Sequence, residues 1–96
     1  MDRMAVKNVN GRQCLEVGGV WIDEAFTAKT DAVVVKAQSD AYFRILELQP
    51  QMKDVYRLGN HLVWVAPSGT ALVIDAGSGK DKLPEAEMTR LFVAKK

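Results

Sequence analysis

Cysteine and histidine are nearly absent from this chain, which has one of each among its 96 residues. Cys14 alone cannot form an internal disulfide bond, and it cannot supply the paired sulfur ligands of a zinc site. We therefore expect no metal, no cofactor and a reducing, cytoplasmic location. The chain also lacks a long apolar run. Its N-terminus has no signal-peptide core, and no segment approaches the roughly twenty apolar residues of a membrane span, so we expect no membrane association.

An excess of charge of either sign is missing as well. Thirteen Lys and Arg residues face twelve Asp and Glu residues, for a net charge of +1. Such a chain has no strong field to attract phosphates, so nucleic acid is not expected as a partner. Hydrophobic residues make up 48% and charged residues 26% of the chain, which is typical of a folded globular protein. The length predicts a single domain covering residues 1–96.

Strand signals dominate the first third of the chain. Asn10-Gly11 is a strong two-residue hairpin signal and predicts that residues 4–9 pair with residues 13–17. Gly18-Gly19 is expected to bend or bulge that second strand, which then continues through residues 20–22.

Three further strands are predicted. Residues 32–37 contain three adjacent valines, whose stiff side chains favour a strand. Residues 61–66 are apolar on both faces after the first residue, as in a central strand covered on both sides. Gly69 closes the turn that returns the chain into residues 70–75 as an antiparallel hairpin.

Helix signals lie between these strands and at the end of the chain. Ser39 is a predicted N-cap, Pro50 separates one helix from the next, and Gly59 ends the second helix. Residues 76–82 are expected to form a flexible link to a C-terminal helix over residues 84–93. Together the patterns predict an α+β domain with a mostly antiparallel sheet of about five strands, two consecutive helices between strands and a C-terminal helix.

Five stretches follow one another in a recognisable order: Gly18-Gly19-Val20-Trp21-Ile22-Asp23, Val33-Val34-Val35-Lys36, Ser39-Asp40-Ala41-Tyr42-Phe43, Leu58-Gly59-Asn60 and the hairpin from Leu62 to Ile74. This order resembles a C-terminal segment of some large bacterial proteins that bear a von Willebrand factor type A domain. The resemblance covers about residues 12–74 and implies that this region folds as one unit. It implies no catalytic role, because none is known for that segment. It does not imply metal-dependent adhesion, because the type A domain and its metal-binding serine motif are absent from this sequence.

Few residues suggest catalysis. His61 is the only histidine, and a carboxylate could orient it as a base, with Asp23, Asp40, Asp54 and Asp75 all available for this role. A rim residue with a satisfied hydrogen bond is nevertheless the preferred interpretation. Cys14 lies in a predicted strand, where a small buried side chain is favoured over a nucleophile. The sequence around Gly79-Lys80 lacks the spacing of a phosphate-binding loop. The acidic pair Asp23-Glu24 is expected to be solvated.

The sequence suggests two hypotheses for the function. A third, that the chain is an enzyme, is less favoured than either. The first is a non-catalytic interaction or assembly module, a homo-oligomer or a binder of another protein, because the two-faced strand and the amphipathic tail need more cover than one small domain provides. Its expected interface residues are Leu62, Trp64, Met88, Leu91 and Phe92. The alternative is a pocket for a small apolar or cationic ligand lined by Trp21, Tyr42, Tyr56 and Trp64, although core packing is the preferred role for these rings.

Overall fold

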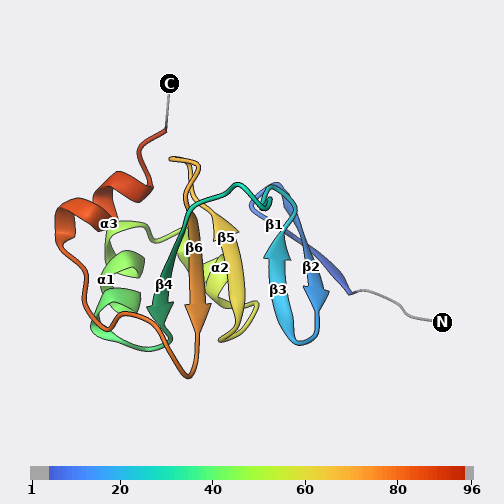
Figure 1. Cartoon of the computed structure of the whole chain (residues 1–96), viewed down its shortest axis with the longest axis horizontal. Helices are drawn as coiled ribbons and strands as arrows, with labels where there is room; N and C mark the ends of the chain where they lie inside the picture. The colour runs from blue at the N-terminus through green and yellow to red at the C-terminus, as the bar shows by residue number, and fades with distance from the viewer. Residues whose placement is uncertain (1–4, 95–96) are drawn as a thin grey trace.

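A computed structural model describes residues 5–94 as a six-stranded sheet with three helices (Figure 1). The elements in chain order are β1 (Val6–Val9), β2 (Arg12–Val17), β3 (Val20–Asp23), β4 (Ala32–Lys36), α1 (Asp40–Leu48), α2 (Met52–Tyr56), β5 (Leu62–Val65), β6 (Ala71–Asp75) and α3 (Glu85–Leu91). The predicted α+β class and the helix pair between strands are therefore confirmed. Met4, where the first strand was expected to begin, lies outside the described residues.

The strands lie in the order β1-β2-β3-β5-β6-β4. Three neighbouring pairs are antiparallel, namely β1 with β2, β2 with β3 and β5 with β6. The other two pairs, β3 with β5 and β4 with β6, are parallel. The β5–β6 hairpin thus lies between β3 and β4, although β3 directly precedes β4 in the sequence.

The sixth strand arises at Gly18-Gly19, where a bend within one strand had been predicted. Both glycines have positive φ, 58° and 88°, and Val17 pairs with Val20 across them. Two consecutive residues with positive φ form the tight turn that matches the twist of a hairpin, and glycine adopts this conformation without strain. The glycines therefore reverse the chain, and β2 and β3 are two separate strands.

The helices begin and pack largely as their sequences predict. The Ser39 side chain accepts a hydrogen bond from the backbone N–H of Tyr42 and caps α1. In Figure 1, α2 lies behind β5 and β6, whereas α1 and α3 lie next to each other at the side of β4. Arg44 on α1 forms an ion pair with Glu85 on α3. Within residues 5–94, no helix has both the length and the apolar character needed to cross a membrane.

Residues 76–82 are bonded to the sheet, which differs from the flexible link that the sequence predicts. Lys80 donates its backbone N–H to Val34 and accepts from the N–H of Lys36, so it pairs with the outer edge of β4. Gly79 has a φ of 120°, and a Cβ atom there would lie only 2.7 Å from the backbone nitrogen of Lys36. A glycine is therefore required for the close approach of this segment to β4.

Candidate functional site

The two faces of the sheet differ sharply in how they are covered. Side chains alternate between faces along each strand, and paired residues in neighbouring strands point to the same face. Leu62, Trp64, Leu72, Ile74 and Val35 therefore share one face, and all of them belong to the buried core with the helices. Among the described residues, no helix lies over the opposite face, which we call the open face.

The open face carries apolar side chains on all six strands, and its polar pair Asn8 and Gln13 lies at one end of β1 and β2. The register places eleven apolar residues on it: Val6, Leu15, Val17, Val20, Ile22, Val63, Val65, Ala71, Val73, Ala32 and Val34. None of them belongs to the helix-side core.

Most of these side chains remain accessible to water. Val6 is 52% exposed, Val17 is 49% exposed and Val34 is 38% exposed, which is high for valine in a sheet. Only Val65 and Ala71 are buried. They lie at the end of the face where the β3–β4 connection passes, since the N–H of Ala71 donates to the carbonyl oxygen of Asp31 at 2.7 Å.

Three polar residues mark the other end of the open face. Lys36 and Asp75 are register partners on β4 and β6, and His61 precedes β5. His61 Nδ1 lies 3.0 Å from Asp75 Oδ1, so of the four carboxylates that the sequence left open, Asp75 is the one beside the histidine. Asp75 Oδ2 accepts hydrogen bonds from the backbone N–H groups of Gly77 and Ser78 and from the Ser78 hydroxyl.

This arrangement does not form a nucleophilic triad. A triad requires the histidine to lie between the hydroxyl and the carboxylate, so that it can remove the hydroxyl proton. Here Asp75 lies in the middle, and Ser78 bonds to the carboxylate oxygen that faces away from His61. The N–H group of Gly77, followed by the Ser78 hydroxyl and N–H, lowers the pKa of Asp75. The geometry favours a carboxylate that holds a turn in place.

The four aromatic residues of the proposed ligand pocket do not surround a common cavity. Tyr42 and Tyr56 stack on each other at 4.0 Å between ring centroids, and the Tyr56 hydroxyl donates to the carbonyl oxygen of Tyr42. Burial raises the pKa of Tyr56 strongly. Trp64 is buried beneath the Arg12 guanidinium, and Trp21 lies under Lys7. The tyrosines thus pack in the core, and the two indoles are covered by separate cations.

The predicted interface residues face the chain's own helices and sheet. Leu62, Trp64, Met88 and Leu91 are all buried, and Phe92 is partly buried against them. Strand β5 does have two apolar faces, as the sequence indicated. Its accessible side chain is Val63 on the open face, because the helices cover the face that carries Leu62 and Trp64.

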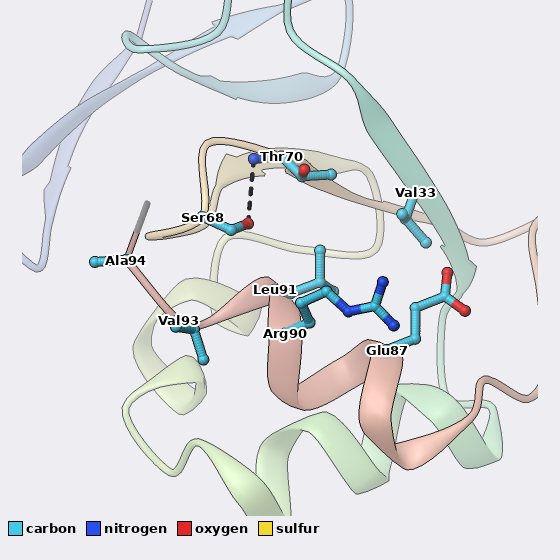
Figure 2. Close-up of a pocket in the computed structure, with 8 residues that line it drawn as sticks. All are labelled: Val33, Ser68, Thr70, Glu87, Arg90, Leu91, Val93 and Ala94. Atoms are coloured by element: carbon cyan, nitrogen blue, oxygen red, sulfur yellow. Dashed lines mark hydrogen bonds between the residues drawn. The ribbon is translucent and has the colours of Figure 1, made fainter. Parts of the chain in front are cut away.

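Two of the grooves on the helix side of the sheet involve the C-terminal segment, which comprises α3 and the following Phe92. The larger has a volume of about 460 Å³ and lies between α3, the start of β4 and the β5–β6 turn (Figure 2). Val33 and Leu91 form its apolar walls, while Glu87 and Arg90 project from successive turns of α3. The smaller groove, of about 370 Å³, is lined in part by Arg12, Trp64 and Phe92. In the described part of the chain, no three His, Cys, Asp or Glu side chains are grouped to hold a metal ion.

The structure also reveals a buried carboxylate where a solvated charge was expected. Asp23 is fully buried, and its Oδ2 accepts hydrogen bonds from Arg12 at 2.6 Å and from the Val65 N–H at 3.0 Å. Its Oδ1 accepts from the N–H of Ala25. The prediction was wrong for Asp23 because its strand continues to that position and pairs with β2, which turns the side chain inward. Glu24 is exposed, as expected.

Comparisons with protein families, with curated proteins and with solved structures find no match to this chain. The resemblance to a segment of von Willebrand factor type A proteins stays a prediction.

Proposed function

We propose that this chain is a non-catalytic interaction module that binds another protein chain through the open face. The observation that carries the proposal is the surface of aliphatic side chains that extends across six strands, with Val6, Val17 and Val34 among its exposed members. Contiguous exposed apolar surface is costly in water, and on soluble proteins it is a common mark of a binding site.

The backbone of the open face supports the same interpretation. Its strands satisfy their hydrogen bonds within the sheet, so a partner that covers the face needs to supply only apolar contacts. The helices form one layer, which covers one face of the sheet, and the open face has no such layer over it in the described structure. A second layer from another chain would complete the usual burial of a sheet with apolar residues on both faces.

The proposal can be tested by affinity capture from the cells that make the protein. Three tagged baits are compared: the natural chain, a variant with Val17→Lys and Val34→Lys, and a control variant with Phe43→Lys. Phe43 is 51% exposed, but it lies on α1, away from the open face. We expect at least one protein, which can be a further copy of this chain, to be enriched about tenfold on the natural and control baits over the double variant. Identical protein sets on all three baits would contradict the proposal.

A second candidate function is binding of a small apolar ligand in the groove beside Trp64. The specific observation is that Trp64 lines a concave space of about 370 Å³ with Met52 and Phe92, a volume within the range of ligand sites. A bound ligand would change the Trp64 fluorescence, and Trp64→Phe would abolish that change. A library of apolar ligands that produces no Trp64-dependent change would retire this candidate.

A further inference from the structure

We infer that the partner of the open face is a second copy of this chain, in a two-fold dimer that packs sheet against sheet. This inference rests on the function proposed above and specifies its partner. In such a dimer the same surface meets itself, so the surface must be complementary to itself in charge and in shape.

The charges of the open face satisfy this condition. Its strand positions include one basic residue, Lys36, and one acidic residue, Asp75, and the two are register partners at one end. The middle of the face, around Val63 and Val73, consists of aliphatic side chains. A face with an excess of one charge would repel an identical copy, and it would favour a partner of opposite sign. The open face carries no such excess, because its two charges cancel.

The edges of the sheet are less suited to dimerisation than its face. The outer edge of β4 is already partly occupied, since Lys80 bonds to Val34 and Lys36. The opposite edge is β1, a strand of only four residues that carries Lys7. Short, charged or covered edges are typical of sheets that avoid edge-to-edge pairing. Face-to-face packing therefore remains the route by which a second copy buries apolar surface.

The area of the face predicts how strong the dimer is. Six strands spaced about 4.8 Å apart and about 16 Å long cover roughly 450 Å². Stable interfaces bury about 800 Å² on each partner, and weak, reversible ones bury less than about 600 Å². The face and its flanking turns fall near the lower class. The dimer is thus expected to form in the micromolar concentration range and to dissociate on dilution.

Analytical ultracentrifugation between about 1 and 500 µM tests this inference. The mass of the natural chain should rise from 10.6 kDa towards twice that value with concentration. The variant with Val17→Lys and Val34→Lys should weaken association at least tenfold, and circular dichroism should show that it folds, since both side chains are already exposed in the single chain. The control Phe43→Lys should associate like the natural chain.

Several results would overturn the inference. A natural chain that stays at 10.6 kDa throughout would exclude self-association. If the affinity capture still identified a different protein bound through Val17 and Val34, the interaction module would stand with another partner; if the capture failed too, both proposals would fail. Unchanged association of the double variant, or an equal loss in Phe43→Lys, would show that the copies meet elsewhere. If the double variant failed to fold, Val17→Lys alone would be measured against the same control.

Discussion

The Asp23 carboxylate on β3 accepts a hydrogen bond from the backbone N–H of Val65 on β5, at 3.0 Å and across 42 positions of sequence. The two strands are parallel, and their register includes only two residue pairs, Trp21 with Leu62 and Ile22 with Val63. This junction joins the N-terminal strands β1 to β3 to the rest of the sheet. Asp23 therefore extends a short backbone ladder with a side chain, and Arg12 balances its buried charge.

Replacement of Asp23 by alanine should destabilise the fold by about 3 kcal/mol, because it removes the carboxylate that pairs with the Arg12 charge and leaves two backbone N–H groups without their acceptor. The value is expected at the lower end of the range for broken buried pairs, since the Arg12 side chain is 34% exposed and can regain water. Urea unfolding measures the change.

The control for this experiment is Asp54→Ala, which removes a carboxylate from an ion pair with Arg57 on the surface of α2. Isolated surface pairs contribute little, so its effect should stay within about 0.5 kcal/mol. Equal effects of the two substitutions would show that the bonds of Asp23 do not stabilise the junction between β3 and β5.

Gly79→Ala should cost about 2 kcal/mol or more in the free energy of unfolding. The φ of 120° at this position strains any residue with a side chain, and the new Cβ would press on the backbone of Val35 and Lys36 at 2.8 Å and 2.7 Å. Gly77→Ala is the matched control, because the nearest atom to its Cβ would be 3.7 Å away. If both variants unfold at the same urea concentration, residues 76–82 do not pack tightly against β4.

The local parts of this fold could be predicted from the sequence because their causes are local. Asn10-Gly11 has positive φ at both residues, 50° and 82°, and Ser39 caps its helix through a bond three residues away. The strand order has no such local cause. The neighbours β3 and β5 begin 42 residues apart, and only the packed core decides that they pair.

The sequence contains the alternation of apolar residues that builds the open face, but this alternation becomes visible only when Gly18-Gly19 is interpreted as a hairpin turn. With Gly18-Gly19 taken as a hairpin turn, Leu15 and Val17 on one strand and Val20 and Ile22 on the next fall on a single face. With the glycines taken as a bulge, this alternation is lost, because the register beyond an extra residue is undefined. The stacking of Tyr42 on Tyr56 gave no comparable signal, since it depends on how α1 and α2 pack together.

Cys14 should react with a thiol reagent at least about 100-fold more slowly in the folded protein than in urea. Its side chain is fully buried, so the reagent has little access to the sulfur. Burial also raises the pKa of the thiol, so the fraction present as the reactive thiolate is reduced. A cysteine introduced at Phe43, which lies on α1 outside the proposed interface and is 51% exposed, should react rapidly in a Cys14→Ala background. Rapid labelling of Cys14 in the folded chain would instead indicate that the β2 region opens readily.

The contribution of Asp75 to stability should depend on pH. The N–H groups of Gly77 and Ser78 and the Ser78 hydroxyl bond to the ionised carboxylate, which lowers the pKa of Asp75 in the folded chain below that of the unfolded chain, about 3.9. A group with a lowered pKa stabilises the fold fully at pH values above its unfolded pKa, and this stabilisation is lost as the pH falls through the folded value. Asp75→Asn should therefore be clearly less stable than the natural chain at pH 6, and the difference should shrink by pH 3.

Urea midpoints measured at intervals between pH 3 and pH 6 follow this difference in stability, with Asp54→Asn as the surface control. A difference that stays constant with pH would mean that the charge of Asp75 does not hold the turn after β6, and that the hydrogen bonds made by an uncharged side chain are sufficient.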